Sequence, residues 1–302
     1  MTLSNLPIEI LSDILYFSLL DEPIPSNILR VCKGFYQVGQ PSLFLDLCFH
    51  SSAQLRLFSQ AQVRPLSLAP RSVTVDLAGR NADFRTFQYL RDALLELRCR
   101  TNLDSHGLEI ISLDAFCLRL HSYAQDTSLQ FIQEALSFIN PRTFTWSGPD
   151  PEHHFSTAIV APVASRLFQA FGSWSNIRHI KVTNIAFPDV DLSVLPLLPV
   201  IPSLQTLYIG QATFLAPQSV AAIFCGNGMM NLERVRLVDA YGGSIWGPRI
   251  RRSDIERAVA LIFSGPVDGG HAIARIRRVV SCEKKTERIM GGDRVEGSAF
   301  LF

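Results

Sequence analysis

Short strand-like segments that share one hydrophobic pattern alternate with helical segments over most of the chain. In each copy, apolar residues or proline occupy a first position and the positions three and five residues later: Pro70/Val73/Val75, Leu108/Ile111/Leu113, Pro141/Phe144/Trp146, Ile177/Ile180/Val182, Leu204/Leu207/Ile209 and Leu232/Val235/Leu237. A weaker copy begins at Ile273 and Ile276. Helical segments lie between these strands, so strand and helix alternate along the chain.

Apolar residues at helical spacing predict helices over 83–98, 127–139, 161–171 and 217–225. Ser253 and Glu256 form a capping-box pair, which predicts a further helix that begins there. Because each helix returns the chain to the same end of the sheet, the strands are expected to be parallel. One copy cannot bury its own apolar face, so the copies are expected to stack into a continuous core.

Residues 6–44 have a helical pattern without strands. Pro7 suits the first turn of a helix whose positions 10, 11, 14 and 15 are apolar. Prolines at 23 and 25 end this helix, Ser26 or Asn27 can cap a second one, and glycines at 34 and 39 keep a third one short. A unit of roughly 45 residues cannot bury all its apolar side chains. Either the next domain or a partner therefore covers them.

The order of these residues resembles an F-box. The resemblance rests on the Leu6-Pro7 opening, the Ile/Leu-rich first helix and the Val31-Cys32-Lys33 stretch before Phe35. F-box proteins are substrate-receptor subunits of cullin–RING ubiquitin ligases. The resemblance implies that a Skp-type adaptor, attached to a cullin scaffold, binds Leu6, Pro7, Ile8, Ile10, Ile14, Leu29, Val31 and Phe35. The alternative is that these helices only cap the following domain.

The strand pattern resembles the leucine-rich repeat, Leu-x-x-Leu-x-Leu-x-x-Asn/Cys-x-Leu. The Asn/Cys position departs from it, because it holds Ala78, Phe116, Pro149, Ile185, Ala212 and Ala240. Without this ladder of asparagines we expect an irregular solenoid. The combination is similar to fungal F-box proteins. The expected fold class is α/β, with a three-helix F-box at residues 1–48 and a leucine-rich-repeat-like solenoid of parallel strands at 49–302. We expect poor order from about residue 283, although residues 299–302 could pack back onto the core.

Composition narrows the possible partners. The chain has 302 residues, of which 47% are hydrophobic and 18% charged, with a net charge of +1. This balance favours a globular protein and gives no sign of nucleic-acid or acidic-membrane binding. The six cysteines are scattered without a Cys-x-x-Cys pair, which favours the reducing cytoplasm or nucleus. No apolar run reaches the ~18 residues of a membrane span.

Motifs for catalysis are missing. The sequence contains no phosphate-binding loop, dinucleotide fingerprint or Gly-x-Ser-x-Gly elbow. The adjacent His153 and His154 are more typical of an exposed loop than of a metal site. We therefore predict no catalytic residue, metal or cofactor, and we do not expect an enzyme.

One charge feature stands out near the end of the chain. Arg249-Ile250-Arg251-Arg252 and Arg275-Ile276-Arg277-Arg278 are near-copies. The simpler interpretation is a solvated edge of the solenoid. The functional one is an anion-accepting patch for an acidic or phosphorylated partner segment, formed by Arg249, Arg251, Arg252, Arg275, Arg277 and Arg278.

The sequence thus predicts a ligase adaptor: the F-box docks to the Skp-type adaptor and the solenoid recruits a protein substrate. A repeat scaffold without a ligase, whose N-terminal helices are only a cap, is the alternative. A third possibility is an α/β enzyme whose site has no recognisable motif.

Overall fold

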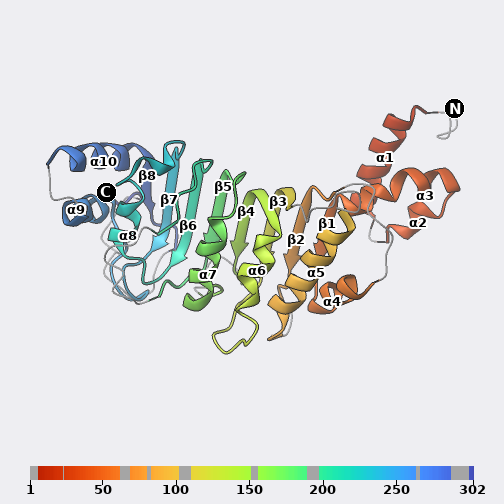
Figure 1. The fold of residues 1–302 in the computed structure, drawn as a ribbon, viewed down its shortest axis with the longest axis horizontal. Helices are drawn as coiled ribbons and strands as arrows, with labels where there is room; N and C mark the ends of the chain where they lie inside the picture. Colours follow the sequence, from red (N-terminus) through yellow and green to blue (C-terminus); the bar gives the residue numbers. More distant parts are fainter. Residues whose placement is uncertain are drawn as a thin grey trace.

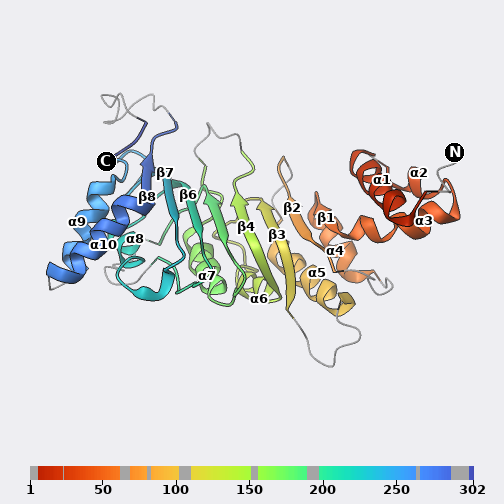
Figure 2. The same ribbon diagram turned by 90° about the horizontal axis from the view of Figure 1, so that it is seen from above.

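The fold is built on one parallel β-sheet whose eight strands lie side by side in chain order (Figures 1 and 2). The computed structural model describes residues 6–22, 24–61, 69–79, 83–101, 110–150, 156–188, 197–262, 266–286 and 299–302. The strands are β1 Asp46–Phe49, β2 Ser72–Asp76, β3 Ile111–Arg119, β4 Ile139–Ser147, β5 His179–Thr183, β6 Thr206–Ala212, β7 Arg234–Ala240 and β8 Val280–Glu283. Every neighbouring pair is parallel, which confirms an α/β fold with parallel strands.

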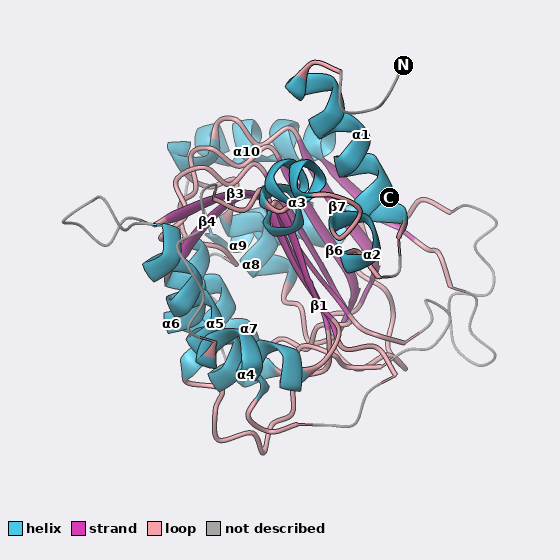
Figure 3. Ribbon diagram, turned by 90° about the vertical axis from the view of Figure 1, so that its right-hand side faces the viewer, coloured by secondary structure: helices cyan, strands magenta, loops and turns pink. Residues whose placement is uncertain are grey.

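Helices lie in most intervals between strands and cover one face of the sheet (Figure 3), whereas the described residues between β5 and β6 form no helix. They are α4 Ser52–Gln60, α5 Thr86–Thr101, α6 Phe131–Ser137, α7 Ala161–Phe171, α8 Pro217–Ala222, α9 Arg252–Ile262 and α10 Pro266–Val279, with a 3₁₀ turn, η3, at Asn227–Met229. Among the described residues, no helix covers the opposite face of the sheet between β3 and β7, and the side chains on this face alternate with the buried ones.

The core lies between the sheet and these helices and is rich in aromatic side chains. Phe144 of β4 stacks on Phe116 of β3, with ring centroids 6.0 Å apart, and meets Phe171 and Trp174 at 5.4 and 5.2 Å. Trp146 is fully buried, and its indole nitrogen donates to the Leu120 carbonyl oxygen at 3.2 Å. This hydrogen bond satisfies the indole N–H, which is the polar group of Trp146 that burial removes from water.

The hydrophobic pattern locates six strands, five of them in register, and fails at both ends of the sheet. The copy Leu108/Ile111/Leu113 is displaced by five residues, because Val73 and Phe144 both pair with Phe116. Strand β1 was not predicted as a repeat. The weak copy at Ile273 and Ile276 was wrong, because both residues lie in α10 and the last strand follows at Val280. Ile139 begins β4 instead of ending a helix, so the helix predicted over 127–139 shortens to α6. Leu108 lies outside the described residues.

Two predicted helix caps are also corrected. In α9, the side chain of Asp254 accepts from the Arg251 backbone N–H, and Ser253 Oγ donates to the Phe302 carbonyl. The Ser253–Glu256 capping box is therefore absent, since Glu256 binds arginines instead. In the second helix, the cap position is Pro25, and no side chain caps it.

Three N-terminal helices and a 3₁₀ turn stand at the β1 end of the sheet (Figure 1). They are α1 Ile8–Asp21, α2 Ser26–Leu29, α3 Lys33–Gly39 and η2 Pro41–Phe44. Leu11, Leu15, Leu19 and Leu29 form their small core. Gly39 packs into it so tightly that a Cβ atom there would lie 2.7 Å from Leu29 Cδ2.

Asp46 joins these helices to the sheet. Its carboxylate accepts hydrogen bonds from Tyr16 Oη of α1 at 2.9 Å, Arg71 Nη2 at 2.7 Å and Ser72 Oγ at 2.5 Å. Burial raises the pKa of Asp46, but the hydrogen bonds from Ser72, Arg71 and Tyr16 outweigh it and hold the pKa below its usual value. The domain boundary predicted between residues 48 and 49 falls inside β1. A boundary that keeps β1 with the rest of the sheet lies before Asp46.

The last four residues pack back onto the sheet. Leu301 is buried, and its N–H donates to the Cys282 carbonyl at 2.8 Å, while Lys284 N donates to the Ala299 carbonyl at 2.7 Å. The expectation that residues 299–302 return to the core is confirmed. Residues 283–286 are ordered at the end of β8 and after it, and the rest of the expected tail lies outside the described residues. Among the described helices, none has the length and hydrophobicity to cross a membrane.

Candidate functional site

Large apolar side chains stand exposed on the outer side of the N-terminal helices. Ile10, Ile14 and Phe17 recur at positions i, i+4 and i+7 of α1, on a face beside that of Leu11 and Leu15. Their exposed fractions are 49%, 38% and 65%, whereas the two leucines are 8% and 1% exposed. The broad apolar stripe predicted for α1 therefore has two halves, one packed inside the helices and one exposed to solvent. We call the exposed half, together with the exposed side chains of Pro7, Ile8, Val31 and Tyr36 in the N-terminal segment, the apolar docking face.

The structure places the predicted adaptor-binding residues in three environments. Pro7, Ile8, Ile10, Ile14 and Val31 are exposed on the helices, and Leu6 and Phe35 are half-buried. Leu29 is only 6% exposed and belongs to the small core, so its assignment to the surface was wrong.

Sequence reasoning missed two exposed aromatic residues on this face, Phe17 and Tyr36. Phe17 follows Ile14 by three positions, so the same helical spacing could have found it.

A second candidate lies on the open face of the sheet, where the side chains that point away from the helices form rows across the strands. One row contains Lys181 on β5, Tyr208 on β6 and Arg236 on β7, because Lys181 pairs with Tyr208 and Tyr208 with Arg236. The Tyr208 ring lies between the two cations: Lys181 Nζ is 5.4 Å and Arg236 Cζ 5.3 Å from its centroid. Such contacts favour a cation over the face of an aromatic ring.

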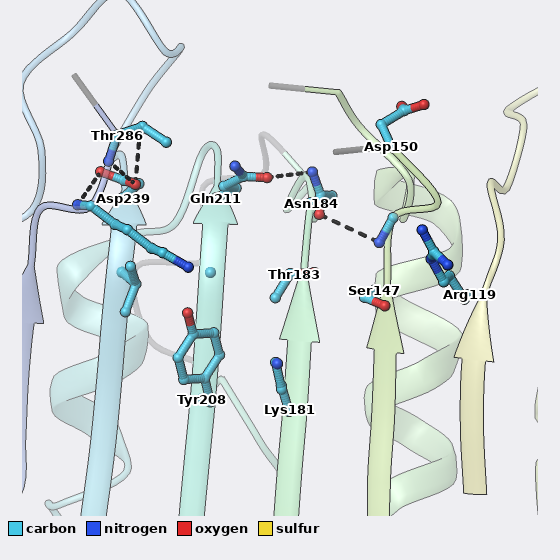
Figure 4. Close-up of a pocket in the computed structure, with 14 residues that line it drawn as sticks. Arg119, Ser147, Asp150, Lys181, Thr183, Asn184, Tyr208, Gln211, Asp239 and Thr286 are labelled. Atoms are coloured by element: carbon cyan, nitrogen blue, oxygen red, sulfur yellow. Dashed lines mark hydrogen bonds between the residues drawn. The ribbon is translucent and has the colours of Figure 1, made fainter. Parts of the chain in front are cut away.

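This row borders a cavity of about 310 Å³ at the carboxyl ends of β3 to β7 (Figure 4). Its lining is polar and comes from five strands and from the segment after β8: Arg119, Ser147, Gly148, Asp150, Lys181, Thr183, Asn184, Tyr208, Gly210, Gln211, Val238, Asp239, Lys285 and Thr286. The lining contains three cationic side chains, those of Arg119, Lys181 and Lys285, and two carboxylates, those of Asp150 and Asp239. The size is at the lower end of the roughly 300–1,000 Å³ of small-ligand pockets, so the cavity suits one small group.

A polar ladder forms the upper rim of the cavity, one residue before the position at which the leucine-rich repeat has asparagine. Asn184, Gln211 and Asp239 follow the paired residues at the ends of three neighbouring strands, and all have positive φ angles of 60°, 46° and 50°. Asn184 Nδ2 donates to Gln211 Oε1, and its Oδ1 accepts from Gly148 N at 3.4 Å. The asparagine ladder is absent from the consensus position in these three strands, but Asn184, Gln211 and Asp239 form a polar ladder one residue earlier. Phe116 was wrongly assigned to the consensus position, because it pairs with Val73 and Phe144 inside the sheet.

The ladder ends in a buried ion pair. Arg249 Nε donates to Asp239 Oδ1 at 2.8 Å, and both side chains are almost fully buried. Asp239 also accepts from Thr286 N at 2.9 Å, from Thr286 Oγ1 at 2.8 Å and from Lys285 N at 3.2 Å. Because Arg249 compensates Asp239, the remaining charge at the cavity is cationic.

The six arginines predicted to form one anion patch differ in burial and in their partners, so they do not form a single patch. Arg249 is buried in the ion pair just described, so it cannot belong to a surface patch. Arg275 turns back to donate to the Met229 carbonyl and lies over the Phe224 ring. Burial lowers the pKa of Arg275.

The other members lie on or beside α9 and α10. Glu256 stands between two of them: its carboxylate is 2.8 Å from Arg277 Nη2 and 3.5 Å from Arg252 Nε. Arg252 also lies over the Phe302 ring. Arg251 and Arg278 are exposed. Arg277 and Arg278 lie in the last turn of α10, and not on the strand that the weak copy at Ile273 and Ile276 predicted.

Searches of the chain against protein-family models and against curated proteins find no match. Among the described residues, no three His, Cys, Asp or Glu side chains are grouped so that they could hold a metal ion. His153 and His154 lie outside the described residues.

Proposed function

We propose that this chain is the substrate-receptor subunit of a cullin–RING ubiquitin ligase, with α1–α3 as an F-box and the strand–helix copies as an irregular leucine-rich-repeat-like solenoid. One observation carries the proposal: the segment that resembles an F-box exposes the apolar docking face at the end of the molecule. Exposed apolar groups of this size are typical of protein–protein contacts. Their burial in a partner would supply about 25 cal/mol per Å² of apolar surface.

The mechanism in this proposal is proximity. The docking face binds a Skp-type adaptor on the cullin scaffold, while the sheet domain holds a protein substrate. Holding both raises the effective concentration of the substrate near the ubiquitin-transferring subunit. Asp46 supports this role, because its bonds to Tyr16, Arg71 and Ser72 tie α1 to the first two strands. The chain itself breaks no bond and needs no cofactor.

Co-precipitation of the tagged full-length protein tests the proposal. The double change Ile10→Ser with Ile14→Ser removes two exposed apolar side chains without touching the small core. We expect it to abolish recovery of the Skp-type adaptor and the cullin. Leu261→Ser, which changes a 76% exposed leucine of α9 at the other end, is the matched control and should recover both.

Equal recovery by the two variants would remove the ligase assignment. The N-terminal helices would then be a cap for the sheet, and the chain would be a repeat scaffold.

A further inference from the structure

An uncompensated cation faces the cavity on the open face of the sheet. Lys181 and Arg236 flank the Tyr208 ring, but only Arg236 is paired with a carboxylate among the described residues. Arg236 is held by both oxygens of Glu283, at 2.9 and 2.6 Å, which lowers the pKa of Glu283. Within the described part of the chain, no carboxylate forms an ion pair with Lys181, whose side chain is exposed at the cavity. Lys181 therefore presents a positive charge and three N–H donors to whatever enters.

Hydroxyl groups surround the same space. Ser147 of β4 and Thr183 of β5 lie beside each other at the strand ends, and Thr183 stands two residues beyond Lys181 on the same face. Figure 4 shows these three side chains and Tyr208 around one space above three neighbouring strands. No hydrogen bond within the described residues uses the hydroxyl of Ser147 or Thr183. Both can therefore donate to a ligand.

The space is kept open by Gly210. A Cβ atom at this position would lie 2.9 Å from Tyr208 Cε1 and 3.1 Å from Thr183 Cγ2. Any larger residue would thus push the Tyr208 ring or Thr183 into the cavity. A glycine in a strand interior costs stability and often marks a place where another group approaches the backbone.

The polar residues at the rim of the cavity already form hydrogen bonds within the chain. Asn184 and Gln211 bond each other, and Asp239 is occupied by Arg249 and Thr286. The second carboxylate of the lining, Asp150, lies 3.1 Å from His121 Nε2 at the edge of the cavity. The donors that remain for a ligand are the Lys181 ammonium and two hydroxyls, with the half-exposed guanidinium of Arg119 at the edge. Arg119 Nη1 also forms an ion pair with Asp76 Oδ2 at 3.3 Å. Because both side chains are partly exposed, solvent screens this ion pair.

We propose that this cavity binds a phosphomonoester group. Phosphate carries up to two negative charges and three acceptor oxygens, which match an ammonium, hydroxyls and a guanidinium arranged around a small space. The cavity volume suits such a group better than a whole nucleotide. The source can be a phosphorylated side chain of a protein that lies across the sheet, or a free phosphate compound. The first source rests on the proposed function and would make the ligand the phosphorylated substrate; the site itself does not depend on it.

The test uses the full-length protein and calorimetric titration with two probes, O-phosphoserine and a degenerate peptide mixture with a fixed central phosphoserine. Serine and the unphosphorylated mixture are the blanks. Lys181→Gln removes the free ammonium, and we expect it to weaken binding of both probes by about tenfold or more, since a hydrogen bond to a charged group contributes roughly 1.5–3 kcal/mol. Arg234→Gln is the matched control. It removes a cation from the same face of the sheet but outside the cavity, and should bind almost like the wild type.

Binding of both probes that Lys181→Gln weakens and Arg234→Gln spares supports a site for phosphorylated protein. Binding of O-phosphoserine alone, with the same variant pattern, supports the site and assigns it to a free phosphate compound. Absence of wild-type binding at 50 mM salt, or equal loss in the two variants, overturns the proposal, because unspecific attraction by surface charge would not distinguish them. Adaptor recovery is measured on the same variants. If Lys181→Gln keeps the adaptor, loss of phosphate binding reports on the cavity and not on the ligase assignment.

Discussion

Removal of the arginine from the buried ion pair is expected to destabilise the protein far more than removal of an arginine from a half-exposed one. The chain offers both cases beside the same sheet. The Arg249 and Asp239 side chains are 2% and 1% exposed, with Nε and Oδ1 at 2.8 Å. The Arg236 and Glu283 side chains are 41% and 18% exposed, with Nη2 and Oε2 at 2.6 Å. The distances are similar, so burial is the variable that differs.

The expected magnitudes follow from what each change leaves behind. Arg249→Met leaves the Asp239 carboxylate buried, and breaking such a pair costs about 3–5 kcal/mol. Three hydrogen bonds from Lys285 and Thr286 still reach this carboxylate, so we expect the lower end, about 3 kcal/mol. Arg236→Met leaves Glu283 in contact with water, and we expect about 1 kcal/mol or less.

Urea unfolding monitored by tryptophan fluorescence measures both variants against the wild type. The account predicts a free energy of unfolding about 2 kcal/mol lower for Arg249→Met than for Arg236→Met. Equal losses in the two variants would refute the reasoning, since they would mean that the buried carboxylate is not left uncompensated. A third variant, Asp239→Asn, should also be destabilised because it leaves the buried Arg249 charge without its partner.

Three further outcomes are expected. The pKa of Asp46 is held below its usual value in the folded protein. Its contribution to stability is therefore present above the unfolded-state pKa of about 3.9 and is lost as the pH falls through the lower folded-state pKa. The stability difference between wild type and Asp46→Asn should shrink between pH 6 and pH 3 in urea titrations. Deletion of residues 299–302 removes the buried Leu301 and should cost about 2 kcal/mol, measured by thermal and urea unfolding; an unchanged transition would contradict its role in the core. Burial raises the pKa of the Cys282 thiol to about 12, so a maleimide should label the exposed Cys32 in the native protein and leave Cys282 unlabelled until urea is added, as peptide mass spectrometry would show.

The strands were predictable because their pattern is set by burial on one face. Val73 and Val75, for example, are both buried, and the residues that alternate with them are half-buried. The prediction failed where burial does not produce this alternation. Ile273 and Ile276 are three residues apart and lie on a helix, a spacing that a short apolar pattern cannot distinguish from a strand.

The candidate sites were only partly predictable for a different reason. The apolar docking face follows from helical spacing in α1, but spacing alone did not show which half of the stripe the other helices cover, nor that Leu29 of α2 is buried. The cavity on the open face of the sheet was missed because its residues are the polar positions between apolar ones. Aligning the copies by their strands would have placed Lys181, Tyr208 and Arg236 side by side. The prediction favoured the conspicuous arginine clusters instead, which largely bind groups of their own chain, as Arg249 and Arg275 do.

The most direct test of the account is a calorimetric titration of the purified full-length protein with a purified Skp-type adaptor. The account predicts a one-to-one complex with a negative heat-capacity change, because apolar surface is buried. Ile10→Ser with Ile14→Ser should weaken it by about tenfold or more, since exposed apolar anchors at the centre of an interface each contribute over about 1 kcal/mol. Leu261→Ser should bind like the wild type. Absence of a complex with the wild type, or a complex that the double variant forms equally well, would contradict the assignment of α1–α3 as an adaptor-binding module.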